Sequence, residues 1–454
     1  SDFMALLAID IETYSDVDLT KSGVYAYSDS PQFEILLFAY AFDEEETQIV
    51  DLACGEKLPQ RVLGALEDTS VIKTAFNAAF ERTCISKYLG RKLSPKAWQC
   101  TAVQSAMLAL PLSLDGVGEV LDIQRKKLKE GTDLVRFFSM PCKPTKANGG
   151  RTRNLPKDEP EKWERFKVYC IRDVDAEREI RYKLRNYPIS ESEMQLYQMD
   201  QNINDRGILV DRELVANAVL CDTQYKESIT ARAYELTGLE NPNSPAQIKG
   251  WLNDRGMEVE SLDKKAVKNM ISDADGEVLE VLKLRLLMAK TSVKKYEAIE
   301  RSVCSDGRCH GLLQFYGANR TGRWAGRLVQ VQNLPQNHIV DLELARSLVK
   351  NQQFDLIDLL YDSTPGVLSE LIRTAFIPKP HTRFIVADFA AIEARVLAWF
   401  SGERWRLQTF ADGGDIYCAS ASQMFGVPVV KHGENGHLRQ KGKIAELALG
   451  YGGS

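Results

Sequence analysis

Two acidic residues near the start of the chain lie in a pattern that suits a metal ion. Asp10 and Glu12 belong to an apolar run over residues 5–13, which predicts a buried strand. Residues two apart on a strand face the same side, so both carboxylates point together. Two like charges on one face of a core strand repel each other unless a cation lies between them. The pattern therefore predicts a cation site on this strand.

Two later stretches carry further candidates for the same site. Asn77-Ala-Ala-Phe-Glu81 begins a predicted helix and places the Glu81 carboxylate near the C-terminal edge of a sheet. Tyr169 and Asp173 are four residues apart and share one face of a long predicted helix, where Asp173 borders the apolar side. The alternatives are an exposed helix-surface acid for Glu81 and a tyrosine that only packs for Tyr169.

Hydrophobic periodicity predicts the elements that must position these side chains. Short apolar runs indicate strands, and apolar stripes at helical spacing indicate helices. Together they predict a mixed sheet flanked by helices. The expected strands cover 5–13, 35–42, 48–52 and 71–76, and the expected helices cover 80–89, 102–108 and 159–185.

In this order and spacing the three motifs resemble those of the proofreading 3′–5′ exonuclease domain of the ribonuclease H-like superfamily. The match comprises Asp10-x-Glu12, Asn77-x3-Glu81 and Tyr169-x3-Asp173. The resemblance implies that the four acids hold two divalent ions, Mg²⁺ or Mn²⁺, and that the tyrosine orients the attacking water. Two ions about 3.5–4 Å apart stabilise both the entering and the leaving oxygen of a phosphodiester. The chain departs from the family at Glu81, where aspartate is usual.

Long helical patterns replace the acidic motifs between residues 189 and 309. Helices are expected over 191–206, 214–236 and 278–301, and another begins at Pro245 with Ser244 as its cap. The helix over 278–301 has a basic face that includes Lys290, Lys294 and Lys295. Such a face is either solvated or in contact with a duplex backbone, and we favour the contact, which would be independent of sequence and sensitive to salt.

A second group of candidates begins at Phe384-Ile-Val-Ala-Asp388. Four apolar residues running into a carboxylate predict a buried strand, with Asp388 placed where the strand emerges, as suits a metal ligand. The alternative is an aspartate that caps the following helix. That predicted helix carries Glu393.

The last predicted helix carries a stripe suited to a nucleotide. Its members step by four residues: Arg439, Lys443, Leu447 and Tyr451. On a helix each such step drifts by only about 40°, so the four form one sloping stripe. Two cations followed by an aromatic ring suit the phosphates and the base of a nucleotide.

Two shorter stretches upstream suit contacts with DNA. Thr321-Gly322-Arg323 is basic and rich in turn residues, and it leads to Gln332-Asn333, whose amides can read acceptors in a minor groove. Together with Asp388, Glu393 and the stripe, these stretches resemble the polymerase domain of family A DNA polymerases, the bacterial DNA polymerase I type. The resemblance covers nearly the whole chain.

The polymerase resemblance implies a role for each residue. Asp388 binds both metal ions, and Glu393 excludes a ribose 2′-hydroxyl. Arg439, Lys443 and Tyr451 bind the incoming triphosphate. The primer and minor-groove contacts fall on Thr321, Arg323, Gln332 and Asn333.

The chain departs from the family pattern at three points. Ala391 replaces a polar residue, and Leu447 stands where the family has Phe or Tyr, which leaves sugar discrimination open. The His-Asp-Glu palm motif, with its second metal-binding aspartate, does not occur up to Ser454. We therefore expect these residues to end within the fingers and not to polymerise by themselves. The lack of a 5′-nuclease domain and the wording of the Asn77–Glu81 motif look phage- or prophage-like.

The composition is that of an ordinary globular protein and does not by itself indicate a function. Apolar residues make up 44% and charged residues 27%, as in ordinary globular proteins, and the net charge of −5 does not by itself indicate a nucleic-acid partner. Nine scattered cysteines favour a reducing, cytoplasmic setting, in a bacterial cell or a phage-infected host. Cys304, Cys309 and His310 lack the second ligand pair of a zinc site. No apolar run reaches membrane-spanning length, so no membrane partner is expected.

The resulting expectation is an α/β (α+β) chain that is a DNA-directed DNA polymerase with a proofreading exonuclease. The expected domains are 1–188, a ribonuclease H-like exonuclease; 189–309, a mainly helical thumb; 310–402, a partial palm; and 403–454, the start of the fingers. Its partners would be primer-template DNA, single-stranded 3′ ends, dNTPs and two Mg²⁺ or Mn²⁺ per active site, with a processivity factor left open. Two other classes stay open: a stand-alone 3′–5′ exonuclease on DNA or RNA, and a non-catalytic DNA-binding module.

Overall fold

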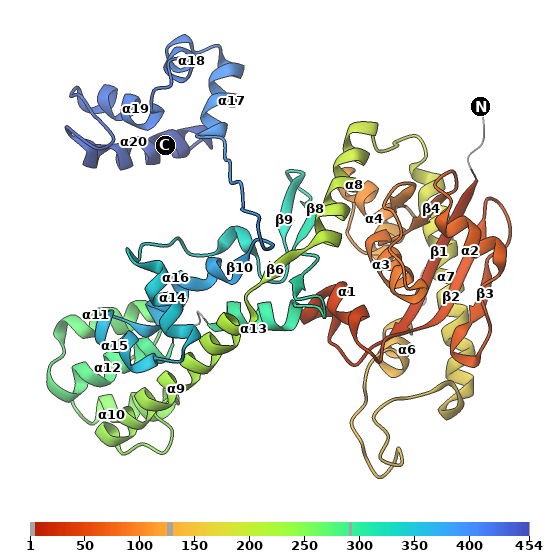
Figure 1. The fold of residues 1–454 in the computed structure, drawn as a ribbon, viewed down its shortest axis with the longest axis horizontal. Coiled ribbons are helices and arrows are strands. Elements are labelled where there is room, and N and C mark those ends of the chain that lie inside the picture. The colour runs from red at the N-terminus through yellow and green to blue at the C-terminus, as the bar shows by residue number, and fades with distance from the viewer. Residues whose placement is uncertain (1–4, 125–129, 290–292, 454) are drawn as a thin grey trace. The chain divides into compact units, whose positions relative to one another are not determined.

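The computed structural model describes residues 5–124, 130–289 and 293–453 (Figure 1). The chain forms two compact units, Ser1–Lys379 and Pro380–Ser454. The domain boundaries expected at residues 188, 309 and 402 stay predictions.

A five-stranded sheet with β1 at its centre is the framework of the first 188 residues (Figure 1). The strand order is β3-β2-β1-β4-β5. β1 pairs antiparallel with β2 and parallel with β4, so its backbone is hydrogen-bonded on both sides. The strands are β1 (Leu6–Tyr14), β2 (Glu34–Phe42), β3 (Gln48–Asp51), β4 (Ile72–Ala75) and β5 (Trp98–Cys100).

Helices pack on this sheet and complete its core. The longest of them, α7, contacts β1 and β2 and buries Trp163, Phe166 and Val174 there. The long loop between α6 and α7 extends away from the sheet in Figure 1. The helices are α1 (Leu19–Asp29), α2 (Gln60–Glu67), α3 (Ala78–Leu89), α4 (Thr101–Met107), α5 (Leu114–Val120), α6 (Gly131–Phe138) and α7 (Pro160–Leu184).

The elements predicted for this region are confirmed, and several others were missed. All four expected strands and all three expected helices form within about two residues of their expected ends. The missed elements are β5, α1, α2, α5 and α6. β5 has only three residues, and α1 is interrupted at Gly23, whose φ of 81° is not helical. Elements this short or irregular leave little periodicity to detect.

Helices dominate the next part of the chain. The predicted helices over 191–206 and 214–236 are confirmed, and Ser244 caps the helix that begins at Pro245 by accepting a hydrogen bond from the Gln247 amide. The helices are α8 (Glu191–Arg206), α9 (Arg212–Thr237), α10 (Pro245–Asn253), α11 (Lys264–Asp273), α12 (Gly276–Met288) and α13 (Val293–Ser302).

The prediction of one continuous helix over 278–301 is wrong. α12 ends at Met288, and α13 is a separate helix. The two halves bury their apolar residues in different cores: Leu282 packs with α10 and α11, whereas Tyr296 packs in the core that includes residues of α9. One straight helix cannot serve both cores. Lys290 of the predicted basic face lies outside the described residues.

Small sheets and short helices complete the first unit. β10, β6 and β7 form a three-stranded sheet, and β8 and β9 form a hairpin. The bounds are β6 (Ile208–Val210), β7 (Arg308–Cys309), β8 (Leu313–Ala318), β9 (Arg323–Gly326), α14 (Leu342–Lys350), α15 (Phe354–Leu360), α16 (Thr364–Leu371) and β10 (Phe376–Ile377); 3₁₀ turns cover Leu52–Cys54, Pro156–Asp158, Val331–Asn333 and Ile372–Ala375.

The second unit is a small group of helices. α20 packs against α19 and α17. The close approach of α20 to α19 needs Gly442, because a Cβ there would overlap the Tyr417 carbonyl oxygen. The helices are α17 (Ile392–Ser401), α18 (Arg404–Ala411), α19 (Ile416–Phe425) and α20 (Arg439–Gly450), and Gly436–Leu438 form a 3₁₀ turn.

The predicted buried strand at residues 384–388 is wrong. This segment has no regular secondary structure and pairs with no strand that the structure describes, and Ile385 and Val386 are 86% and 90% exposed. An apolar run becomes a strand only where a neighbour accepts its hydrogen bonds and a packed layer covers it. The helix-cap alternative for Asp388 is wrong as well, because the N-cap of α17 is Ala391.

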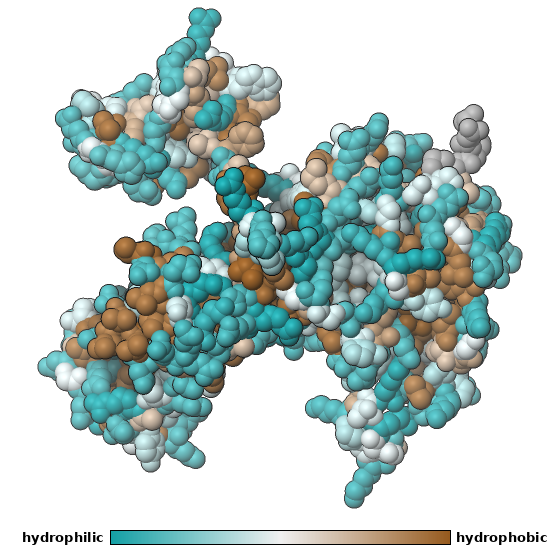
Figure 2. Space-filling model, viewed as in Figure 1, coloured by the Kyte–Doolittle hydropathy of each residue, from teal (hydrophilic) through white to brown (hydrophobic). Residues whose placement is uncertain are grey.

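Polar side chains cover most of the face shown in Figure 2. Exposed apolar side chains gather over α14 and α15, where Val340, Leu359 and Leu360 are 103%, 77% and 54% exposed. Among the described residues, no helix combines the length and the apolar character needed to span a membrane.

Candidate functional site

β1 and α7 together form a compact group of possible metal ligands. Asp10 and Glu12 face the same side of β1, as their spacing predicts, and Glu12 is only 8% exposed. Cys170 of α7 lies against them, so that one ligand atom from each of the three residues falls within 4.8 Å of the others. The Cys170 thiol donates a hydrogen bond of 3.5 Å to Asp10 Oδ2. The sheet and the helix therefore converge on the Asp10 carboxylate.

Tyr169 and Asp173 of α7 point into the same region. Both are buried, at 4% and 5% exposure. Burial raises the pKa of the Tyr169 hydroxyl, and the carboxylates of Glu12, Asp173 and Asp10 raise it further. The hydroxyl therefore keeps its proton and serves as a hydrogen-bond donor. The Tyr169 ring fits because residue 131 is glycine, since the Cβ of any other residue at this position would overlap the ring.

Glu81 joins this group from α3. It is 5% exposed, so the alternative of an exposed helix-surface acid is wrong. Within the described chain its Oε2 is buried and has no hydrogen-bond partner. Burial raises the pKa of Glu81 well above its ordinary value, and the charges of Asp10, Glu177 and Asp173 raise it further. A buried, unpartnered carboxylate beside other acids fits a divalent cation, which would supply the missing partner.

The sequence reasoning missed two residues of this region. Glu177 lies one helical turn after Asp173, is 2% exposed and accepts a hydrogen bond of 2.6 Å from the Thr101 hydroxyl. Burial raises its pKa, although Arg181 opposes the shift. The four-residue step from Asp173 was the available signal for Glu177. Cys170 was not predicted as part of the site, because nothing in its sequence context marked it as a neighbour of Asp10.

A cavity of about 690 Å³ opens beside these acids. Asp10, Glu81 and Asp173 line one part of it, and Phe80 and Tyr316 contribute aromatic rings. α8 and β8 form another part of the lining through these residues: Tyr197, Asp200, Gln201, Asn204, Leu313, Gln314 and Phe315. The cavity thus joins a possible metal site to apolar and aromatic surfaces, as a site for a small ligand or a nucleotide requires.

The second unit brings three of the predicted nucleotide-binding residues together. The Tyr451 hydroxyl donates a hydrogen bond of 2.7 Å to Glu393 Oε1. Both residues and Leu447 line one small cavity of about 50 Å³ between α17 and α20. Glu393 lies in the first turn of α17, and Tyr451 directly follows the last residue of α20.

The two cations of the stripe lie on α20 as predicted. Arg439 donates a hydrogen bond of 2.7 Å to the carboxylate of Asp415, which is half-buried. This hydrogen bond and the positive charge of Arg439 hold the pKa of Asp415 below its usual range. Lys443 follows one turn later and is half-buried. Asp388 lies outside the helices, on the exposed segment that precedes α17.

The predicted DNA-contact residues share an exposed region of the first unit. Thr321 is in the turn of the β8–β9 hairpin and Arg323 begins β9. Gln332 and Asn333 lie in the following 3₁₀ turn, and all four residues are exposed. On α13, Lys294 is exposed, while Lys295 donates a hydrogen bond of 2.7 Å to the carbonyl of Val329, close to this turn in the chain.

Comparison with known proteins identifies relatives of the chain. The model for DNA polymerase family A matches residues 220–454. The DNA polymerase of Bacillus phage SP02 is 57% identical over 451 residues, which are 99% of this chain and 70% of that polymerase. DNA polymerase I of Lactococcus lactis subsp. lactis (strain IL1403) is 23% identical over 300 residues, 63% of this chain and 30% of that protein.

Among the solved structures that resemble the chain is one that matches 99% of it. It is the POL domain of Pol1 from M. smegmatis, in complex with DNA primer-template and dNTP. The TM-score is 0.59 at 16% sequence identity, and the match covers 99% of this chain and 68% of that chain. At this identity the likeness shows the fold alone, and it confirms the predicted α/β class with a right-hand polymerase architecture.

Proposed function

The chain belongs to DNA polymerase family A, whose members are DNA-directed nucleotidyltransferases. We propose that, in addition, residues 1–188 form a 3′–5′ exonuclease whose activity depends on two divalent cations. The observation that carries the proposal is Glu81: a buried carboxylate with an unpartnered oxygen, beside Asp10 and Asp173 at the end of a cavity. Only a cation, or a proton, makes such a group tolerable in the folded state.

Each residue of the proposed exonuclease has a distinct task. Asp10, Glu12, Glu81 and Asp173 would hold the cations, Mg²⁺ or Mn²⁺, which suit carboxylate oxygens. When bound, two such ions supply electrostatic stabilisation of the oxygens that enter and leave the phosphodiester. The Tyr169 hydroxyl, which keeps its proton, donates a hydrogen bond that orients the attacking water.

The cavity supports a single-stranded 3′ end as the ligand. Aromatic faces such as that of Phe80 accept a base of any identity, because every base offers a π-face. The direct test is the shortening of a 5′-labelled single strand from its 3′ end, which requires Mg²⁺ or Mn²⁺ and stops on chelation. Equal digestion of RNA with no binding of dNTP would favour the stand-alone exonuclease, and no digestion at all would favour the DNA-binding module.

We propose that the second unit binds the incoming dNTP for the polymerase reaction on primer-template DNA. Arg439 and Lys443 would contact the phosphates, Leu447 and Tyr451 would lie by the sugar and base, and Asp388 would be a metal ligand. The hydrogen bond between Tyr451 and Glu393 supports a closed surface beside the sugar. The contacts with DNA would come from six residues of the first unit: Thr321, Arg323, Gln332, Asn333, Lys294 and Lys295.

Lys443→Ala is expected to weaken dNTP binding about tenfold or more. A hydrogen bond to a charged group contributes about 1.5–3 kcal/mol, and about 1.4 kcal/mol corresponds to a factor of ten. Titration calorimetry with dNTP and Mg²⁺ measures the change. Lys441→Ala is the control, because Lys441 is exposed on the same helix and lies 5.4 Å from the ring of Phe425. Equal affinities in both variants would contradict the assignment.

A further inference from the structure

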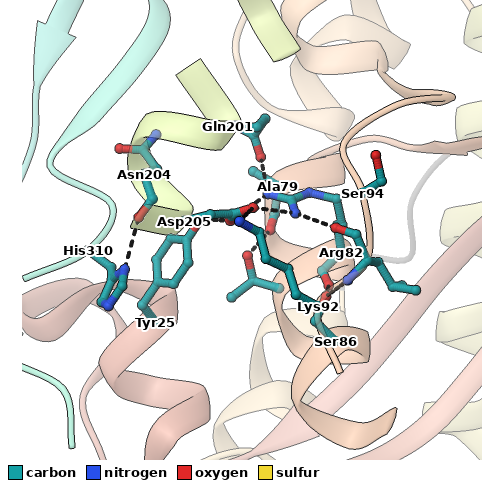
Figure 3. Close-up of polar contacts among 12 residues, drawn as sticks. Tyr25, Ala79, Arg82, Ser86, Lys92, Ser94, Gln201, Asn204, Asp205 and His310 are labelled. Carbon is teal, nitrogen blue, oxygen red and sulfur yellow. Dashed lines mark hydrogen bonds and ion pairs between the residues drawn. The ribbon is translucent and has the colours of Figure 1, made fainter. Parts of the chain in front are cut away.

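A buried ion pair joins α3 to α8 (Figure 3). Arg82 donates two hydrogen bonds to Asp205, from Nη1 to Oδ2 at 2.9 Å and from Nη2 to Oδ1 at 2.8 Å. The Arg82 and Asp205 side chains are 2% and 6% exposed. A bidentate pair of this kind fixes the mutual orientation of two groups as well as their distance.

The surroundings of the pair keep it charged and satisfy it with further hydrogen bonds. Arg82 also donates to the carbonyl of Leu93 at 2.9 Å and to Gln201 Oε1 at 3.1 Å. The Tyr25 hydroxyl donates a 2.6 Å hydrogen bond to Asp205 Oδ1, and Lys92 lies 3.3 Å from Oδ2. Figure 3 shows Tyr25, Arg82 and Lys92 converging on Asp205 from α1, α3 and the segment that follows α3. The contacts hold the pKa of Asp205 below its usual value in spite of burial.

The chain position of Arg82 connects this pair to the candidate metal site. Arg82 directly follows Glu81 on α3, so any rotation or shift of this turn of the helix moves both side chains. Successive helical residues point about 100° apart, which allows Glu81 to face the cavity while Arg82 faces α8. The helix is thus held on one side by the ion pair and presents a carboxylate on another.

The α8 end of the pair is equally fixed. Gln201 and Asn204 lie on α8 with Asp205 and line the cavity that Glu81 lines. Asn204 holds β8 by donating to the carbonyl of Leu313 at 2.9 Å and accepting from its amide at 3.1 Å. The network therefore runs from the helix that carries Glu81 to residues of α8 and β8 that line the same cavity.

We propose that Arg82 and Asp205 are positioning residues of the exonuclease, which fix α3 against α8 and thereby set where Glu81 stands relative to Asp10 and Asp173. The inference rests on the proposed exonuclease function. It assigns the pair a role beyond stability, because a buried ion pair is by itself weak support for stability and is often replaceable by apolar residues. Glu81 depends on such support more than a shorter aspartate would, since its longer side chain has more rotamers to restrict.

The test is the metal dependence of single-strand digestion by Asp205→Asn in the 454-residue chain. The substitution keeps the shape of the side chain and removes its charge. The Mn²⁺ concentration for half-maximal digestion is expected to rise about tenfold, as for loss of an outer-shell partner of a metal ligand. KM for DNA is expected to change less, because the aromatic surfaces of the cavity are untouched.

Asp211→Asn is the matched control. Asp211 also pairs with cations, Arg346 and Lys350, and asparagine retains its capping bond to the Leu214 amide. Neither Asp211 nor its partners line the cavity beside Glu81. This variant should lose thermal stability without any shift in Mn²⁺ dependence. An unchanged Mn²⁺ dependence in folded Asp205→Asn, or an equal shift in Asp211→Asn, would overturn the proposal.

Arg82→Lys provides a second variant in case Asp205→Asn does not fold. Lysine keeps the positive charge but cannot form the bidentate contact, so the same rise in Mn²⁺ requirement is expected. Wild-type Mn²⁺ dependence in Arg82→Lys would overturn the proposal on its own. The proposed exonuclease function fails separately, if the unaltered chain digests no single strand. If the unaltered chain digests DNA and both variants show the Mn²⁺ dependence of the unaltered chain, only the positioning role is contradicted.

Discussion

Asp10→Ala is expected to lower the rate of nucleotide release from a single-stranded 3′ end about a thousandfold. Asp10 is the carboxylate on which β1, α7 and α3 converge: it accepts a hydrogen bond from Cys170, and its charge raises the pKa of Glu81 and of Tyr169. A metal ion supplies several kcal/mol of transition-state stabilisation, and each 1.36 kcal/mol is a factor of ten in rate, which gives about three orders of magnitude.

The measurement is single-turnover digestion of a 5′-labelled oligonucleotide in Mg²⁺. Glu164→Ala is the control, because Glu164 is an acid of α7 whose side chain is 70% exposed and bridges to Lys167. It should digest DNA at the rate of the unaltered chain. Asp10→Ala with full activity would show that digestion takes place elsewhere, or by other chemistry.

Glu81→Gln is expected to stabilise the metal-free protein and to abolish most of the stabilisation that a divalent cation confers. In the folded state burial and neighbouring acids hold the pKa of Glu81 above its ordinary value of 4.5. Folding therefore favours the protonated carboxyl, so the stability from this group is full below that ordinary value and is lost as pH rises through the folded-state pKa. Glutamine cannot ionise and escapes this loss.

When a cation is bound, the unaltered chain is expected to be more stable than Glu81→Gln, the reverse of the order without metal. At a concentration one hundred times its dissociation constant, a ligand stabilises the folded state by about 2.7 kcal/mol, and the unaltered chain should gain this from Mn²⁺. The variant lacks one carboxylate ligand and should gain much less. Calorimetric melting temperatures at neutral pH, in chelator and in Mn²⁺, give the comparison. A variant that melts lower in chelator and gains as much from Mn²⁺ as the unaltered chain would contradict the role of Glu81.

Local spacing predicted the parts of the site that lie within one element. The two-residue step of Asp10 and Glu12 on β1, the four-residue step of Tyr169 and Asp173 on α7, and the stripe on α20 all follow from the geometry of a single strand or helix. The positions of these residues on their elements are confirmed, except that Tyr451 directly follows the last residue of α20. Their proposed chemistry stays a prediction.

Contacts between distant segments could not be predicted in the same way. Cys170 meets Asp10 from 160 positions away, and Asp205 meets Arg82 from 123 positions away, so no periodicity in one element marks either pair. The burial of Glu81 likewise depends on the packing of α3 against the sheet and not on the pattern of its own helix. Tertiary contacts also decided the errors: residues 384–388 have strand-like composition but no paired neighbour among the described residues.

Anomalous diffraction from crystals soaked in Mn²⁺ would locate the ions of the proposed exonuclease site. We expect ions bound by Asp10, Glu12, Glu81 and Asp173 at the end of the cavity, with Tyr169 close to a water on one of them. We also expect that the same soak of Asp10→Ala crystals loses at least one of these ions. Well-ordered crystals with no anomalous peak beside these four carboxylates, at a Mn²⁺ concentration that supports digestion in solution, would contradict the proposed site.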